Sequence, residues 1–187
     1  MNISAVVITK NEESSIERCL KSVLFCQEII IIDDNSTDKT IELAKKYKAT
    51  VYTKTMNNNF ADQRNFGITK ANGEWILFID ADEELSNELQ KEIQETLSSP
   101  DDNVKGYSLK RRDIFWNNEL KYGEVQKVRN NGLIRLAKKG SGIWKGKVHE
   151  VVDGEGDIKL LKGYINHFPH QDIKTFLKKK NDDVDQF

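Results

Sequence analysis

Two carboxylates one residue apart stand directly after the most apolar run of this chain. Residues 75–79 read Trp-Ile-Leu-Phe-Ile, and Asp80, Ala81, Asp82 and Glu83 follow. Such a run is typical of a strand buried on both faces of a parallel sheet. Ligands of open α/β sheets bind at the carboxyl ends of strands, so Asp80 and Asp82 could hold a divalent cation there. Taken alone, a polar strand exit followed by a helix cap explains the same residues more simply.

Polar clusters also follow two other predicted strands. Residues 9–12 read Thr-Lys-Asn-Glu after strand 3–9, and residues 33–38 read Asp-Asp-Asn-Ser-Thr-Asp after strand 28–32. A carboxylate in the second cluster could accept a hydrogen bond from a base or a ribose, as the acidic residue of dinucleotide-binding folds does. Both clusters are equally compatible with capping, and Ser36 or Thr37 is a candidate N-cap for the next helix.

Phosphate binding would need charge from side chains or a metal. The chain contains neither G-x-G-x-x-G nor G-x-x-x-x-G-K-[ST], which argues against a dinucleotide enzyme and a P-loop NTPase. Arg64, in a predicted helix over 60–70, could direct its guanidinium towards a nucleotide or its phosphates. An arginine on a helix is usually a surface residue, so its position alone says little.

The elements that must position these residues alternate between strand and helix. The predicted strands are 3–9, 28–32, 49–52 and 75–79, and helices are predicted at 39–47, 60–70, 87–97 and from residue 11 to about 24. This alternation predicts right-handed βαβ units and a parallel sheet. The expected fold class is therefore α/β, with a central, mostly parallel, Rossmann-like sheet flanked by helices.

The second half has a different character. Short β-like pieces at 106–111, 133–136 and 158–161 are separated by Gly and Asn, and residues 115–131 have the polar, aromatic composition of a binding loop. Residues 171–187 are expected to form a basic C-terminal helix. We therefore expect a single domain over 1–187, with a nucleotide-binding half at 1–99 and an irregular half at 100–170 for a second substrate.

Composition excludes several classes of protein. The chain of 187 residues has 29 basic and 30 acidic residues, and its net charge of −1 does not indicate a nucleic-acid partner. No run of 18 apolar residues predicts a transmembrane helix, and the first residues lack the pattern of a signal peptide. Cys19 and Cys26 have neither a C-x-x-C spacing nor a histidine cluster, so we expect reduced, buried thiols in a cytosolic protein.

Taken together and in order, the motifs resemble those of the family-2 glycosyltransferases with a GT-A fold, which are inverting enzymes that use nucleotide-diphosphate sugars. The segments that carry this resemblance are 6–12, 31–38, 64–65 and 80–83. Residues 144–150 (Trp-Lys-Gly-Lys-Val-His-Glu) and 165–168 (Ile-Asn-His-Phe) are similar to the bacterial subgroup that contains lipopolysaccharide-core β-glucosyltransferases. The resemblance covers almost the whole chain.

This resemblance implies roles in donor binding. Thr9, Glu12 and Asp34 are expected to line the pocket for the base and ribose, and Arg64 to contact the nucleotide or diphosphate. Asp80 is expected beside the ribose and the metal.

The resemblance also implies a metal site and a catalytic pair. Asp82 is expected to bind Mg²⁺ or Mn²⁺ bridging the two phosphates, and His167 to be a further metal or phosphate ligand; oxygen ligands suit either ion. Glu150 is the expected general base, because among the second-half carboxylates it alone stands beside a histidine in an aromatic-flanked segment that matches the family. His149 is expected to position that base or the diphosphate.

The expected reaction transfers a sugar from a nucleotide-diphosphate sugar, with a UDP-hexose as the expected donor, to a hydroxyl group. The acceptor would be a glycan, a lipid-linked sugar or a lipopolysaccharide core in bacterial cell-surface assembly. We expect a cytoplasmic enzyme with peripheral membrane contact through its C-terminal region.

Two other classes remain open at this stage. A GT-A-like nucleotidyltransferase would have a Gly-rich loop after the first strand, and residues 9–12 contain no glycine. A non-catalytic nucleotide-sugar-binding remnant would be expected to lack some of Asp82, Arg64 and Glu150, all of which are present.

Overall fold

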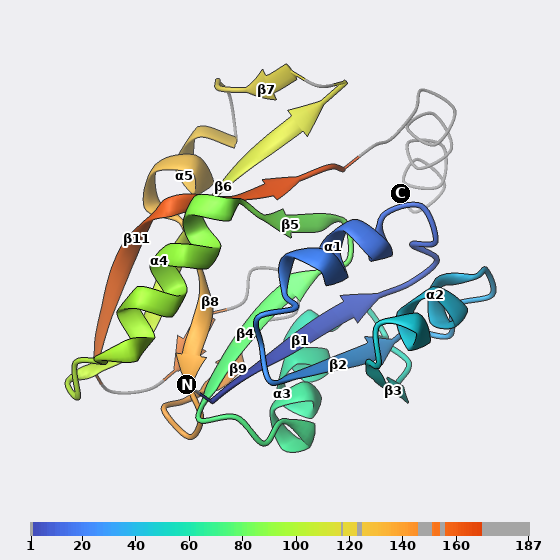
Figure 1. Cartoon of the computed structure of the whole chain (residues 1–187), viewed down its shortest axis with the longest axis horizontal. Coiled ribbons are helices and arrows are strands. Elements are labelled where there is room, and N and C mark those ends of the chain that lie inside the picture. Colours follow the sequence, from blue (N-terminus) through green and yellow to red (C-terminus); the bar gives the residue numbers. More distant parts are fainter. Residues whose placement is uncertain (1, 117, 123–124, 146–150, 154–155, 170–187) are drawn as a thin grey trace.

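A computed structural model describes residues 2–116, 118–122, 125–145, 151–153 and 156–169. Its centre is a nine-stranded sheet in the order β3-β2-β1-β4-β8-β6-β11-β5, with β7 paired to β6 (Figure 1). The predicted C-terminal helix at 171–187, together with His149 and Glu150, lies outside the described residues.

Strands β1 to β4 of the first half are mutually parallel, as the alternation of strands and helices predicts. β1 pairs in parallel with β2 and β4, and β2 pairs in parallel with β3. Every residue of β1 is buried, which explains its largely apolar sequence. The bounds are β1 Ile3–Thr9, β2 Glu28–Asp33, β3 Thr50–Thr53, β4 Trp75–Asp80 and β5 Glu83–Leu85.

The second half is more regular than predicted. Its strands extend the same sheet: β8 pairs antiparallel with β4 and β6, β6 pairs in parallel with β11, and β5 pairs antiparallel with β11. The bounds are β6 Val104–Phe115, β7 Asn118–Leu120, β8 Leu133–Lys138, β9 Ile143–Lys145, β10 Val151–Asp153 and β11 Asp157–His167. The complete sheet is therefore mixed, with one parallel part formed by β1 to β4 and another by β6 and β11.

The prediction that residues 115–131 form a loop was wrong. The segment contains the end of β6, the strand β7 and the helix α5, which spans Val125–Asn131. The polar composition arises because β7 is a short strand at the margin of the sheet whose residues are largely exposed to solvent. Strands of this kind carry no apolar pattern that a sequence can display.

Helices cover the sheet on both faces. Side chains of α1, α2 and α4 pack with strands of both halves in one apolar cluster, and α3 packs with Trp144 of β9 in another on the opposite face. The bounds are α1 Ile16–Ser22, α2 Thr40–Lys46, α3 Phe60–Lys70 and α4 Asn87–Ser98. Cys19 and Cys26 are buried and form no disulfide, as expected. None of the helices among the described residues has the length and apolar character to cross a bilayer.

The predicted cap of α2 was also wrong. Its N-cap is Lys39, whose side chain makes no capping bond, and the N–H of Thr40 donates to Asp38 Oδ1 instead at 2.9 Å. Ser36 is used elsewhere, because its hydroxyl accepts a hydrogen bond from the N–H of Asn11 at 2.9 Å. The loops that follow β1 and β2 are thereby joined to one another.

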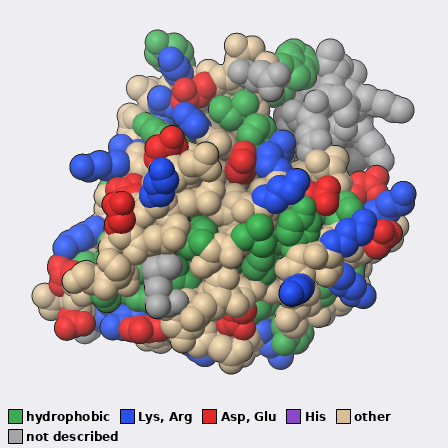
Figure 2. All heavy atoms as spheres, viewed as in Figure 1, with side chains coloured by type: hydrophobic (Ala, Val, Ile, Leu, Met, Phe, Trp, Pro, Cys, Tyr) green, Lys and Arg blue, Asp and Glu red, His purple; other side chains and the backbone are tan. Residues whose placement is uncertain are grey.

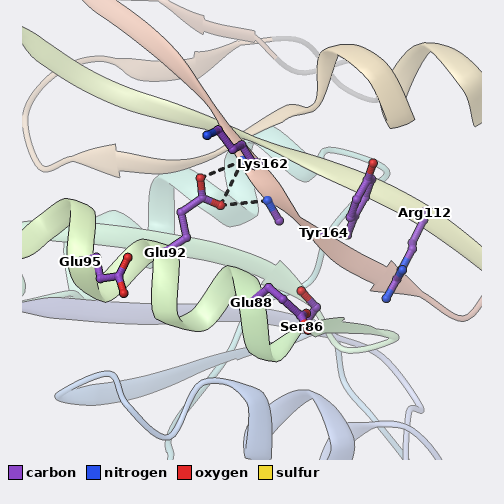
Figure 3. A pocket seen from close by; sticks show the side chains of 8 residues that line it. Ser86, Glu88, Glu92, Glu95, Arg112, Lys162 and Tyr164 are labelled. Carbon is purple, nitrogen blue, oxygen red and sulfur yellow. Dashed lines mark hydrogen bonds between the residues drawn. The ribbon is translucent and has the colours of Figure 1, made fainter.

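Helix α4 lies against the part of β11 that β5 leaves uncovered. The carboxylate of Glu92 accepts hydrogen bonds from the N–H groups of Lys162 and Gly163 at 2.8–3.0 Å (Figure 3). These bonds satisfy backbone donors that would otherwise form an open sheet edge. A cavity of about 570 Å³ lies between the glutamates of α4 and the side chains of Arg112, Lys162 and Tyr164. The absence of a side chain at Gly163 allows this close approach.

We predict that Gly163→Ala destabilises the fold. A Cβ atom at this position would lie 2.7 Å from Leu89 Cα, so α4 would have to move away from β11. Overpacking of this kind costs about 1–3 kcal/mol, which urea denaturation followed by circular dichroism would measure. Lys162→Ala is the matched control, because it removes an exposed side chain and keeps the N–H that binds Glu92. Equal stability of the two variants would contradict the packing described here.

Candidate functional site

A cavity of about 450 Å³ opens at the carboxyl ends of β1, β2 and β4. Strand ends and the loops after them supply most of its walls, as expected for the ligand site of an α/β sheet. The lining residues are Ile8, Thr9, Lys10, Glu12, Asp34, Met56, Asn58, Phe60, Asp80, Ala81, Asp82 and His167.

Most of the predicted site residues meet in this cavity. The structure brings together six of them, from four separate segments of the chain: Thr9, Glu12, Asp34, Asp80, Asp82 and His167. Arg64 does not line the cavity and instead lies behind it, against Asp80. The predicted catalytic pair, His149 and Glu150, falls outside the described residues.

Asp34 lies at the end of β2, on the wall formed with the loop after β1. Its Oδ2 lies 2.8 Å from Lys10 Nζ, and its Oδ1 accepts a hydrogen bond from the N–H of Met56 at 3.0 Å. Burial alone would raise the pKa of Asp34, but the bonds from Lys10 and Met56 hold it below its ordinary value. Asp34 is therefore an ionised acceptor at neutral pH.

Asp80 is held by two buried arginines. Its Oδ1 lies 3.1 Å from Arg64 Nη2, and its Oδ2 lies 2.8 Å from Arg135 Nη2. Burial would raise the pKa of Asp80, but Arg135 and then Arg64 keep it below its ordinary value. The carboxylate is therefore ionised and fixed in orientation. Each oxygen still has a second lone pair that can accept a bond from a ligand in the cavity.

Arg64 is enclosed on its other side by Trp144. Its guanidinium lies 5.1 Å from the ring centroid of Trp144, which also packs edge-on against Phe78 of β4. The side chain of Asn65 bonds both the N–H and the C=O of Trp144, at 2.9 Å each, and so ties β9 to α3. Burial and the like charge of Arg135 lower the pKa of Arg64 to about 10, so it remains a cation at neutral pH.

Glu83 continues the ion pairing away from the cavity. Its Oε1 lies 3.4 Å from Arg135 Nη2 and 3.8 Å from Arg111 Nη1, and its Oε2 accepts the N–H of Asp80 at 3.1 Å. Glu83 is completely buried, and this burial raises its pKa. It supports the turn between β4 and β5 from within.

Asp113 of β6 links Arg111 to His167. Its Oδ1 lies 3.3 Å from Arg111 Nε and in a close hydrogen bond with His167 Nδ1. The other ring nitrogen of His167, Nε2, faces Asp82 Oδ2 at 3.4 Å. Burial would lower the pKa of His167, but its contacts with Asp113 and Asp82 raise it to about 9.

These contacts form one sequence of alternating charges, which we call the charge network. Its members, in order, are Arg64, Asp80, Arg135, Glu83, Arg111, Asp113, His167 and Asp82. Three of them, Asp80, Asp82 and His167, line the cavity. The others hold these three in position.

The sequence reasoning missed Arg135, Arg111 and Asp113 as parts of the site. One signal was available, because Arg135 interrupts the apolar strand that reads Leu-Ile-Arg-Leu at residues 133–136. A charge at a buried strand position requires a partner. The sequence does not say which of the many carboxylates that partner is.

The possible metal-binding side chains of the cavity suit an ion that binds together with a substrate. Among the described residues, no cluster of three or more His, Cys, Asp and Glu side chains could hold an ion unaided. Asp82 and His167 nevertheless face each other on the cavity wall. Mg²⁺ and related ions often bind through one or two carboxylates together with substrate phosphates. The residues therefore fit an ion that is shared with a phosphorylated ligand.

Comparison with known proteins adds a family. The model of the family described as "Glycosyl transferase family 2" matches residues 4–182. An uncharacterized glycosyltransferase of Rickettsia bellii is 44% identical over 188 residues, covering 96% of this chain and 64% of the relative. LpsC of Rhizobium meliloti, named as a lipopolysaccharide core biosynthesis glycosyltransferase, is 31% identical over 174 residues, covering 89% of this chain and 63% of LpsC.

A solved structure shares the fold. Residues 1–349 of Staphylococcus aureus TarS, in complex with UDP-GlcNAc, align with a TM-score of 0.67 and 17% identity, covering 92% of this chain and 60% of that TarS fragment. At this identity the likeness concerns the fold alone. The chain spans less than two thirds of the length of the first curated relatives that it matches.

We predict that the charge network is a large contributor to stability. Arg135→Met removes a buried cation and leaves Asp80 and Glu83 without it, which should cost about 3–5 kcal/mol of unfolding free energy. Urea denaturation would measure the loss. Adding Glu83→Gln to Arg135→Met should recover part of it, because one of the unpaired buried charges is then removed.

Arg112→Met is the matched control on the neighbouring strand. The described contacts of Arg112 are a hydrogen bond to Asn166 and the ring of Tyr164, so this change should cost less than about 1 kcal/mol. Similar losses for Arg112→Met and Arg135→Met would refute a special role for the network.

Proposed function

The chain belongs to glycosyl transferase family 2 and has the GT-A fold, and we propose that it catalyses inverting, metal-dependent transfer of a hexose from a UDP-sugar to an acceptor hydroxyl. The observation that carries the proposal is the meeting of Thr9, Asp34, Asp80, Asp82 and His167 in one cavity at the strand ends. LpsC, named for lipopolysaccharide core biosynthesis, supports a cell-surface glycan as acceptor. TarS, solved with UDP-GlcNAc, supports a UDP-sugar as donor.

The base and ribose of the donor would lie against Thr9, Glu12 and Asp34. Thr9 lines the cavity, and its buried Oγ1 has no hydrogen-bond partner among the described residues. An ionised Asp34 can accept an N–H of the base or a hydroxyl of the ribose. Asp80, with both oxygens oriented by arginines, would accept a ribose hydroxyl.

The diphosphate would be bound at the Asp82 side of the cavity. Asp82 and His167 would hold Mg²⁺ or Mn²⁺ together with the two phosphates, and His167 would give up its Nε2 proton on binding the cation, because a ligating imidazole is neutral. Arg64 would add positive charge from behind Asp80. When bound, the cation stabilises the negative charge of the leaving diphosphate. Asp113 has a positioning role in this proposal, because its bond to His167 Nδ1 turns Nε2 towards Asp82.

Inversion requires a base across the sugar from the diphosphate. We propose Glu150 for this role and His149 as its positioning neighbour. Lys145 and Val151, which bound the segment that contains both, pair with each other in register. The preceding residue, Trp144, lies against Arg64, so this hairpin starts beside the Asp80 end of the cavity.

Other carboxylates of the second half are less suitable as the base. Asp113 is buried between Arg111 and His167, which hold its pKa below its ordinary value. Glu119 is paired with Arg129. Asp157 begins β11, at the opposite end of the strand from His167.

In the proposed step, Glu150 takes the proton of the acceptor hydroxyl while the oxygen of that hydroxyl attacks the anomeric carbon. The bond from that carbon to the diphosphate oxygen breaks on the opposite face, and the configuration inverts. The acceptor would be a glycan, a lipid-linked sugar or a lipopolysaccharide core, reached at the inner face of the membrane.

We predict that UDP stabilises the protein only weakly without Mn²⁺ and strongly with it. A ligand raises the melting temperature with the logarithm of its saturation, so thermal shift across UDP-, GDP- and dTDP-sugars would also identify the donor. Asp82→Asn should abolish the Mn²⁺-dependent part, because a neutral amide binds the cation poorly. Asp34→Ala is the contrasting variant and should weaken uridine and UDP alike. If Asp82→Asn responds to UDP and Mn²⁺ as the parent does, the proposed metal site is wrong.

We predict that Glu150→Gln lowers turnover by roughly 10²- to 10⁴-fold, the range typical of a lost general base. Donor affinity should stay near that of the parent, because the base faces the acceptor. Calorimetry with a UDP-sugar and a transfer assay, run on both proteins, would measure the two effects. Survival of turnover in Glu150→Gln, with its loss in Glu124→Gln or Asp153→Asn, would place the base elsewhere.

A further inference from the structure

The hairpin of β6 and β7 carries exposed hydrophobic side chains close to the proposed reaction centre. Trp116 is 51% exposed, and Leu120 and Tyr122 are exposed as well. Hydrophobic side chains are visible at the end of the molecule where these strands lie (Figure 2). Exposed aromatic groups that gather in one place often mark a binding surface.

The strand register places part of this surface on the face that bears the charge network. Leu120 is paired with Asp113, and Phe115 follows Asp113 by two residues on β6. Paired residues, and residues two apart, point to the same face of a sheet. Asp113 binds His167, which lines the cavity. Phe115 therefore stands about 7 Å along the strand from Asp113, beyond the end of β11 at His167.

The conformation of Trp116 is unusual for its residue type. Its φ is +46°, in the left-handed region that a bulky side chain rarely adopts, at a cost of about 1–3 kcal/mol. This turn stacks the ring of Trp116 on that of Phe115, with centroids 4.4 Å apart and an angle of 37° between the planes. Half of the indole remains open to solvent.

We propose that Phe115, Trp116 and Leu120, here called the hairpin platform, bind a sugar ring of the acceptor. The inference rests on the proposed function and names the acceptor group that this surface would recognise. A donor bound with its diphosphate at Asp82 and His167 would place the reacting hydroxyl across the anomeric carbon from these two residues. The platform would hold a neighbouring sugar of the same acceptor, at the hairpin of β6 and β7.

The chemistry of the hairpin favours a saccharide over a lipid chain. A pyranose has an apolar C–H face and a polar edge, and therefore suits an aromatic ring bordered by hydrogen-bonding groups. On this hairpin, Asn118 is paired with Phe115 and therefore lies on the same face as that ring. An alkyl chain would require a continuous apolar channel, whereas polar residues interrupt the apolar ones here.

Tryptophan fluorescence offers a direct test of binding. The chain has three tryptophans, and Trp75 and Trp144 are buried, so iodide should quench mainly Trp116. The probes are core oligosaccharides released by mild acid from a panel of rough lipopolysaccharides, added in the presence of UDP and Mn²⁺. At least one should protect Trp116 from iodide, and vesicles of phosphatidylethanolamine and phosphatidylglycerol should not. Protection by vesicles alone, or by no probe, would overturn the proposal.

Kinetics with the protective oligosaccharide test the role in acceptor binding. Trp116→Gly removes the ring and suits the positive φ, so it should melt no lower than the parent. It should raise the acceptor KM roughly tenfold, which corresponds to about 1.4 kcal/mol, with kcat little changed. Trp116→Phe should retain most of the affinity. Leu24→Ala is the control, because Leu24 is 57% exposed but follows α1, away from β6 and β7.

Failure of the platform and failure of the proposed function give different results. Stabilisation by UDP and slow hydrolysis of the UDP-sugar by water do not involve the acceptor. If both are normal in Trp116→Gly and the acceptor KM equals that of the parent, the platform is refuted while the proposed function stands. If the parent protein shows neither, the proposed function itself is refuted.

Discussion

The pairing of buried charges is the constraint on which the rest of this structure depends. A charged group removed from water is stable only when opposite charges and hydrogen bonds surround it. Asp80 meets this condition through Arg64 of α3 and Arg135 of β8, and Glu83 and Asp113 meet it through arginines of β8 and β6. A shift of any of these elements would leave a buried charge without its partner. The charge network therefore holds the two halves of the chain in one arrangement.

This arrangement also separates the tasks of the two carboxylates after β4. Asp80 points towards the buried arginines while still reaching the cavity, and Asp82 points towards His167. The side chains of Asp82 and His167 are about one fifth exposed, at 21% and 17%, so both remain accessible to a ligand. In the proposed reaction, Asp80 and its arginines provide a rigid wall, and Asp82 and His167 provide the groups that meet the diphosphate. Rigid support of this kind is what a binding site for a metal and a phosphate requires.

Much of the first half could be predicted from the sequence because its signals are local. The apolar runs at 3–9 and 75–79 became β1 and β4, and the helix predicted at 60–70 became α3 with the same bounds. The second half could not be predicted as well, since its strands are half-exposed and carry mixed polar and apolar residues. The segment 115–131 reads as a loop, yet it forms the end of β6, β7 and α5. β7 pairs with the end of β6 only three to seven residues earlier in the chain, but its exposed side chains leave no apolar pattern that would mark it as a strand.

The sequence by itself determined which residues stand at the strand ends, and so it determined the polar character of the cavity. The apolar runs of the sequence predict the strand ends at which Thr9, Asp34, Asp80 and Asp82 stand. Such runs are recognisable because a buried strand needs several apolar residues in succession. The pairing of Arg135 with Asp80, the bond between Asp113 and His167, and the placement of Phe115 and Leu120 on the face of the sheet that bears Asp113 come from the tertiary structure alone. The first two contacts join residues 55 and 54 positions apart, and the third feature depends on strand register. Neither long-range pairing nor register leaves a periodic pattern in a single sequence, since both follow from how the strands assemble.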